Sequence, residues 1–213
     1  LRVRDLTLRD GQQSLFATRL KQEYIDRLLP LYRDAKFYIM ETWGGAVPDS
    51  VMRYLGESPW DRLRSCSKEM KGISYLSALS RGRNLFGYVP YPNYVLEGFY
   101  KEAIKNGLNV MRIFDALNDL RNIEVAVDEA IKAGAHVQGT LCYTTSPIHN
   151  IDMFVQLSRD LEKMGVHSIC IKDMAGIMTP QNAYDLTKAI KAAVKLPIVV
   201  HTHSTTGLGA MTL

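Results

Sequence analysis

The 213-residue chain has the composition of an ordinary globular protein and a net charge of only +4. Apolar residues make up 46% and charged residues 23%, and at about 150 residues per domain the length predicts little more than one domain. No stretch approaches the ~20 apolar residues of a transmembrane helix, so we expect no membrane insertion. The positive charges are scattered and do not form a dense basic face, so we expect no nucleic-acid partner.

The N-terminal segment and the cysteines predict a cytoplasmic location. Residues 1–11 carry charges throughout and lack the apolar core of a secretory signal. Cys66, Cys142 and Cys170 are odd in number and far apart, and the chain contains no CxxC pair. We therefore expect buried thiols in a reducing compartment, with neither a disulfide framework nor a cysteine zinc site.

Short apolar runs typical of β-strands alternate along the chain with segments of helical periodicity. The predicted strands span residues 6–9, 37–43, 73–79, 109–116, 136–144, 167–174 and 196–203. Helical periodicity lies between the predicted strands, for example over residues 21–33, 93–105, 123–132, 152–163 and 179–194. Thr179 and Pro180 form a helix-start signal, while Gly107, Gly134 and Gly165 stand where helices end. This alternation predicts seven βα units and a parallel sheet.

Two features favour an incomplete (β/α)8 TIM barrel over a doubly wound open sheet. The G-x-G-x-x-G turn of dinucleotide-binding sheets does not follow the first predicted strand. Polar and charged residues instead cluster after the predicted strands, where TIM barrels build their active sites. A complete barrel usually needs ~250 residues, so we expect the eighth strand to be absent here.

Two histidines at the end of the last predicted strand indicate a metal site. His201 and His203 are two residues apart, so their side chains share one face of a strand. Asp10 follows the first predicted strand, and its carboxylate can reach the same metal at the mouth of a barrel. Two imidazoles and a carboxylate suit a divalent cation. The alternative is that the histidines merely end a strand and that Asp10 caps a turn.

A lysine and two arginines complete the candidate residues. Lys172 lies in a predicted buried strand, where an ammonium ion is costly. It can be neutral, paired, converted by CO2 into an anionic carbamate ligand, or exposed at the strand end. Arg9 and Arg81 stand at strand ends, where their guanidinium groups can bind both oxygens of a small carboxylate substrate. The alternative for each arginine is a structural ion pair, with Glu41 and Asp115 as natural partners.

Eight segments, in this order, resemble one enzyme family. They are LTLRDGQQSLFATR (6–19), ETWGGA (41–46), PWDRLR (59–64), SRGRNLFGY (80–88), RIFDALND (112–119), GTLCYTTSPIH (139–149), IKDMAG (171–176) and HTHSTTG (201–207). Together they resemble the carboxyltransferase domain of biotin-dependent enzymes. This family includes pyruvate carboxylase, the oxaloacetate decarboxylase alpha subunit and the pyruvate-using transcarboxylase subunit. FATR and TTSPIH favour the branch with oxaloacetate decarboxylase, transcarboxylase and separate-subunit pyruvate carboxylase.

The resemblance implies that residues 1–213 form a partial carboxyltransferase TIM barrel with zinc, manganese or cobalt at its mouth. The family's metal ligands correspond to Asp10, Lys172 as a carbamate, His201 and His203. Its pyruvate pocket corresponds to Arg9, Gln13, Arg81 and Tyr88, and its catalytic residues to Lys172 and Arg81. The implied reaction is carboxyl transfer between carboxybiotin and pyruvate or oxaloacetate through a metal-stabilised enolpyruvate.

The resemblance also implies partners: a biotin carrier domain, other carboxylase or decarboxylase subunits, and further copies in a homo-oligomer. The sequence departs from the family where Gln12 replaces a histidine. The family's C-terminal helical region, which carries a proton-transferring threonine, and its Met-Lys-Met carrier motif do not occur in these residues. One alternative is an acyl-CoA lyase or synthase of the hydroxymethylglutaryl-CoA lyase or isopropylmalate synthase type, which shares Arg-Asp-Gly and His-x-His. Another is an inactive truncated barrel.

Overall fold

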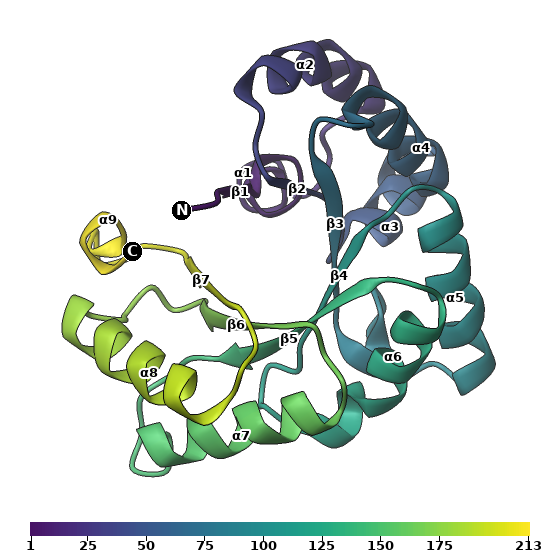
Figure 1. The fold of residues 1–213 in the computed structure, drawn as a ribbon. Coiled ribbons are helices and arrows are strands. Elements are labelled where there is room, and N and C mark those ends of the chain that lie inside the picture. Colours follow the sequence, from purple (N-terminus) through teal and green to yellow (C-terminus); the bar gives the residue numbers. More distant parts are fainter.

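A computed structural model describes residues 1–213 and contains seven parallel strands in one curved sheet. The strands are β1 (Arg4–Asp5), β2 (Ile39–Gly44), β3 (Tyr75–Ser80), β4 (Val110–Ile113), β5 (His136–Cys142), β6 (Ser168–Asp173) and β7 (Ile198–Thr202). Each strand pairs with the next one along the chain, whereas β1 and β7 are not paired with each other. The prediction of a parallel, incomplete TIM barrel is thus confirmed (Figure 1).

The longer helices follow the strands and lie outside the curved sheet (Figure 1). The longer ones are α2 (Gln22–Ala35), α4 (Pro59–Met70), α5 (Asn93–Lys105), α6 (Leu120–Lys132), α7 (Ile151–Lys163) and α8 (Pro180–Ala193). The shorter helical segments are η1 (Thr7–Gly11), α1 (Gln12–Leu15), α3 (Val47–Ser50), η2 (Val51–Leu55), η3 (Gly82–Asn84) and α9 (Gly209–Thr212). No helix combines the length and the apolar character that crossing a membrane requires.

Local signals explain where several helices begin. The side chains of Asp119, Asn150 and Thr179 accept backbone amide hydrogen bonds at the starts of α6, α7 and α8. Such caps satisfy amides that have no partner within the first helical turn. The predicted helix at residues 93–105 agrees with α5 at both ends, whereas α4 lies in a βα unit for which no helix bounds were predicted. The few apolar residues with which α4 faces the core are separated in the sequence by charged residues, so the helical period is weak there.

The predicted position of the first strand is wrong. Residues 6–9 do not form a strand, because β1 ends earlier and the chain turns at once into the π-helical η1. The carboxylate of Asp5 starts this turn by accepting hydrogen bonds from the amide and hydroxyl of Thr7, at 3.1 and 2.8 Å. Arg9 and Asp10 therefore project from a helical turn rather than from the end of a strand.

The apolar core lies between the sheet and the helices. Trp43 of β2 is fully buried, donates a hydrogen bond from Nε1 to the carbonyl of Pro59 at 2.9 Å, and packs against Trp60 and Phe99. The aromatic contact couples β2 to α4 and α5. The three cysteines are free and buried, as predicted.

We expect Trp43→Ala to lower the free energy of unfolding by about 3–5 kcal/mol, because a large cavity opens between β2 and its helices. Urea denaturation measures the loss. Tyr94→Ala is the matched control, since Tyr94 is 74% exposed and its removal should cost less than about 0.5 kcal/mol. Equal losses in the two variants would contradict this account of the core.

Candidate active site and metal centre

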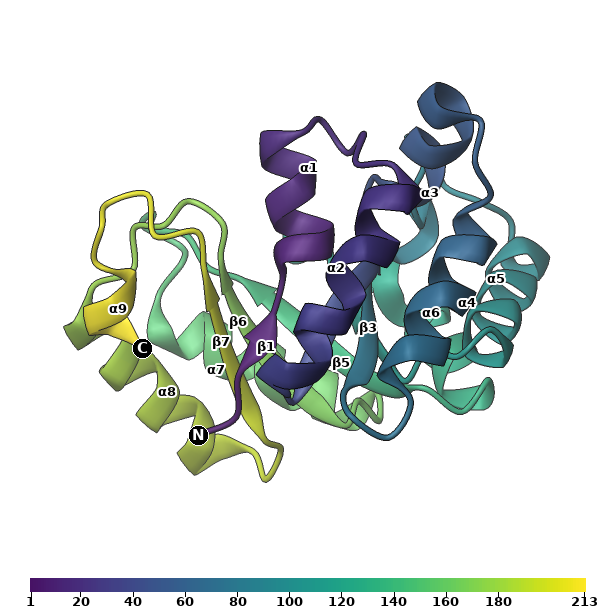
Figure 2. The same ribbon diagram turned by 90° about the horizontal axis from the view of Figure 1, so that it is seen from above.

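Three potential metal ligands meet at the end of the sheet where the strands finish. Asp10 belongs to η1, His201 lies in β7 and His203 follows that strand. Oδ2 of Asp10 lies 3.5 Å from Nε2 of His201 and 3.1 Å from Nε2 of His203. One donor atom from each residue lies within 4.8 Å of the other two. Figure 2 shows α1 and the loops after β6 and β7 at this same end.

The protonation of this cluster is set by burial and by neighbouring charges. Burial together with the charges of Lys172 and Arg112 lowers the pKa of His201 to about 2, so its ring is neutral. Burial alone would raise the pKa of Asp10. The hydrogen bond with His203 and the charge of Arg9 outweigh burial and hold the pKa of Asp10 below its usual range. The cluster therefore offers an ionised carboxylate and a neutral imidazole.

Lys172 lies beside this cluster on β6. It is in register with His201 on β7, is 2% exposed, and its Nζ lies 3.4 Å from Nε2 of His201. Burial and the charge of Arg9 lower the pKa of Lys172, and Asp10 opposes them only in part. The shift favours the neutral amine, which is the form of lysine that reacts with CO2.

A buried carboxylate, Glu41 of β2, holds three arginines inside the sheet. Oε1 of Glu41 lies 2.7 Å from Nε and 2.6 Å from Nη2 of Arg9. Oε2 lies 3.5 Å from Nη1 of Arg112 and 3.7 Å from Nη1 of Arg4. Burial would raise the pKa of Glu41, but Arg112, Arg9 and Arg4 together hold it at about 2. Glu41 is therefore ionised at neutral pH.

Arg9 links this carboxylate to the candidate metal ligands. Its third guanidinium nitrogen, Nη1, lies 3.1 Å from Oδ1 of Asp10, and the side chain is 2% exposed. Gln13 lies nearby, where Oε1 accepts a hydrogen bond from the amide of Ala46 at 3.1 Å. Gly45 allows this close packing. A Cβ at Gly45 would lie 2.8 Å from Oε1 of Gln13 and 3.1 Å from Cδ of Arg9.

The other two candidate pocket residues follow β3. Arg81 is half-buried and forms no salt bridge, and burial lowers its pKa. Tyr88 lies further along the same connection and is 81% exposed. Asp115 does not pair with Arg81. It accepts hydrogen bonds from the amides of Leu117 and Asp119 and thereby shapes the turn before α6. The guanidinium of Arg81 is therefore free to bind an anion.

Two residues that position the cluster, Asp173 and Arg112, were not among the site residues predicted from the sequence. Asp173 is buried next to Lys172; its carboxylate accepts hydrogen bonds from Ile177, Met178 and Thr202, and its carbonyl accepts one from the amide of His203. Arg112 of β4 reaches His201 from across the sheet, with Nη1 at 3.3 Å from Nδ1. The signal for both was a charged residue inside an apolar run.

Comparison with known proteins shows which proteins the chain resembles. Residues 110–212 match the HMGL-like family model. The chain is 50% identical over 212 residues to a pyruvate carboxylase subunit from Methanocaldococcus jannaschii, covering 100% of this chain and 37% of that protein. It is 45% identical over 213 residues to the methylmalonyl-CoA carboxyltransferase 5S subunit of Propionibacterium freudenreichii, covering 99% of this chain and 42% of that protein.

A solved structure agrees with these sequence relatives. It is the carboxyl transferase domain of Rhizobium etli pyruvate carboxylase with pyruvate and biocytin, with a TM-score of 0.95 and 37% identity over 100% of this chain and 37% of that one. The chain is therefore a homologue, over its whole length, of the carboxyltransferase domain of biotin-dependent enzymes. It spans about two fifths of the length of the curated relatives above.

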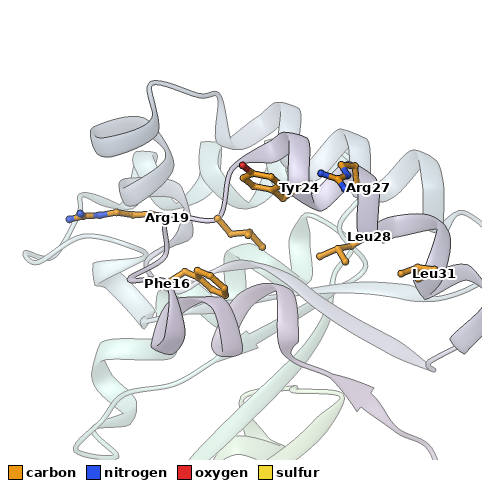
Figure 3. Close-up of a pocket in the computed structure, with 7 residues that line it drawn as sticks. Phe16, Arg19, Tyr24, Arg27, Leu28 and Leu31 are labelled. Atoms are coloured by element: carbon orange, nitrogen blue, oxygen red, sulfur yellow. The ribbon is translucent and has the colours of Figure 1, made fainter.

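The carboxyltransferase fold also leaves a groove beside α2 (Figure 3). The groove has a volume of about 580 Å3 and is lined by five apolar residues, among them Phe16, Tyr24 and Leu31, and by Arg19 and Arg27. None of the candidate site residues lines it. The groove is thus separate from the cluster at the strand ends, and its lining holds no acid or base that titrates near neutral pH.

We expect Glu41→Gln to lower the free energy of unfolding by about 3–5 kcal/mol at pH 7, because three buried arginines lose their counter-charge. The depressed pKa of Glu41 stabilises the fold above its ordinary value of 4.5, and this contribution disappears as the pH falls toward about 2. The difference between wild type and variant should therefore shrink over that range.

Urea denaturation at several pH values between 7 and 3 measures this difference. Glu102→Gln is the control, because Glu102 pairs only with exposed Lys105 and its loss should cost less than about 1 kcal/mol. A difference between wild type and Glu41→Gln that does not depend on pH would contradict the assignment.

Proposed function

We propose that the protein catalyses biotin-dependent carboxyl transfer between carboxybiotin and pyruvate or oxaloacetate. The observation that carries this proposal is the convergence of Asp10, Lys172, His201 and His203 at the end of the sheet. Homology to carboxyltransferases supports the same reaction, and the solved relative contains pyruvate and biocytin. The sequence relatives across the whole chain are carboxylases and carboxyltransferases, which favours this reaction over that of an acyl-CoA lyase or synthase.

The donor set fits a divalent cation such as zinc, manganese or cobalt. Asp10 would supply a carboxylate oxygen, His201 and His203 would supply imidazole nitrogens, and a carbamate on Lys172 would supply a further oxygen. One donor atom from each of Asp10, His201 and His203 lies within 4.8 Å of the other two, which is close enough for all three to bind the same cation. When bound, the cation acts as a Lewis acid for negative charge that develops on the substrate.

The chain's own residues would bind and orient pyruvate. Arg81 has a free guanidinium for the substrate carboxylate or for the charge that develops on the carbonyl oxygen. Gln13 and Tyr88 would donate hydrogen bonds to substrate oxygens. Arg9 would add positive charge at the base of the pocket while it holds Asp10. These contacts would fix the methyl group of pyruvate for proton removal.

The bond changes balance without an external oxidant or reductant. The N–C bond of carboxybiotin breaks and releases CO2, and the biotin nitrogen takes up the proton that leaves the methyl group of pyruvate. The resulting enolate forms a C–C bond to CO2 and gives oxaloacetate. In reverse, the same steps decarboxylate oxaloacetate.

Biotin would reach this site on a carrier domain elsewhere in the protein or on another subunit. Other carboxylase or decarboxylase subunits and a homo-oligomeric state belong to the same proposal. A cytoplasmic location agrees with the three unpaired, buried cysteines.

We expect the full-length protein to decarboxylate oxaloacetate faster when free biotin is added, and His201→Ala to abolish that stimulation. The histidine variant is needed because stray divalent metal decarboxylates oxaloacetate without an enzyme. Absorbance of oxaloacetate measures the rate. His136→Ala is the control, since His136 begins β5 at the opposite end of the sheet. Unchanged stimulation in His201→Ala would rule out the proposed site.

We expect Lys172→Ala to retain less than about a tenth of wild-type activity, because the loss of a metal ligand costs several kcal/mol. Depleting CO2 and bicarbonate should lower the metal content of the wild type reversibly, and Lys172→Ala should not respond. Atomic absorption after gel filtration measures the bound metal. A metal content in the wild type that ignores bicarbonate would exclude the carbamate.

A further inference from the structure

Arg112 makes a contact with His201 that the proposed reaction does not use. It extends from β4 across the inside of the sheet to β7, and its side chain is 1% exposed. Nη1 lies 3.3 Å from Nδ1 of His201, while Nε donates a hydrogen bond to Oε1 of Gln138 at 2.9 Å. Nη1 also lies 3.5 Å from Oε2 of Glu41. The guanidinium is thus held from three sides.

The chemistry of the guanidinium determines the direction of the contact with His201. Arginine carries N–H donors only and has no acceptor, so Nδ1 must accept the hydrogen bond. A neutral imidazole that accepts at Nδ1 carries its proton on Nε2. Nε2 is the nitrogen that faces Oδ2 of Asp10, at 3.5 Å, and Nζ of Lys172, at 3.4 Å; the neutral amine of Lys172 can accept its hydrogen bond. The proton therefore sits on the nitrogen that the proposed metal centre would use.

We propose that Arg112 is a positioning residue that holds His201 as the Nε2–H tautomer and thereby weakens cation binding at this ring. Histidine ligands usually donate the second ring N–H to a carboxylate, a carbonyl or water, which leaves the ligating nitrogen free of its proton. Arg112 imposes the opposite arrangement and adds a positive charge beside the ring. A cation at Nε2 has to displace the proton, which must pass to solvent or to Nδ1 with loss of the Arg112 contact, and the cation also acts against that charge. The affinity part of this inference rests on the proposed metal centre.

The surrounding contacts make Arg112 suited to this task. Glu41 and Gln138 fix the guanidinium independently of His201, so the hydrogen bond to Nδ1 does not depend on the metal centre. Glu41 is also bound by Arg9 and Arg4, so replacing Arg112 leaves the carboxylate with two cationic partners. A substitution at this position can therefore change the environment of His201 without leaving Glu41 unpaired.

The tautomer is tested first, on the metal-free full-length protein. Nitrogen-15 NMR of labelled histidine, with His201→Ala to assign the signals, should show a protonated Nε2 and a hydrogen-bonded, unprotonated Nδ1. Arg112→Gln should remove the shift that the hydrogen bond causes at Nδ1, and Arg112→Lys, which also only donates, should retain it. A protonated Nδ1 in the wild type would overturn the proposal.

Cation affinity is the second readout and does not depend on activity. Titration with Co2+, followed by its visible absorption, should show about tenfold tighter binding to Arg112→Gln than to the wild type, within the usual range for residues behind a metal ligand. Arg112→Lys should bind Co2+ as the wild type does. Unchanged or weaker binding by folded Arg112→Gln would refute the proposal. If the wild type binds no Co2+, the metal centre is excluded, and the NMR result still decides the tautomer.

Discussion

The buried carboxylate of Glu41 connects the packing of the sheet to the geometry of the candidate site. It holds Arg9 through two guanidinium nitrogens, and Arg9 in turn contacts Asp10. It also lies beside Arg112, which reaches His201. Two of the three potential metal ligands are thus positioned through arginines that share one counter-ion. A buried ion pair of this kind costs desolvation, so the Glu41 carboxylate both balances the buried arginines and orients them toward the two ligands.

The interior of the sheet contains more positive than negative charge. Three arginines and Lys172 share this space with only two carboxylates, Glu41 and Asp10. Burial and this excess both lower the pKa of Lys172, which favours the free amine. Conversion of that amine to a carbamate would add negative charge where the interior has too little. Electrostatics and the proposed chemistry therefore favour the same change at one side chain.

Much of the fold could be predicted because the signals are local. The period of apolar residues and the helix caps depend on neighbours within a few positions, and α5 was predicted at both ends. The predicted position of the first strand was wrong because Asp5 starts a π-helical turn after only two strand residues. The bounds of helix α4 were not predicted, and its buried side chains alternate with charged ones. In both cases a local polar group competed with the apolar pattern.

The sequence by itself determined the order of the βα units, the face that His201 shares with His203, and the set of residue types at the strand ends. Only the tertiary structure decided which of them meet. It brought Asp10 to the two histidines, paired Arg9 with Glu41, left Arg81 free and placed Arg112 behind His201. Side-chain alternation is a property of one strand, whereas a distance across the sheet depends on its curvature and on the register of every strand between.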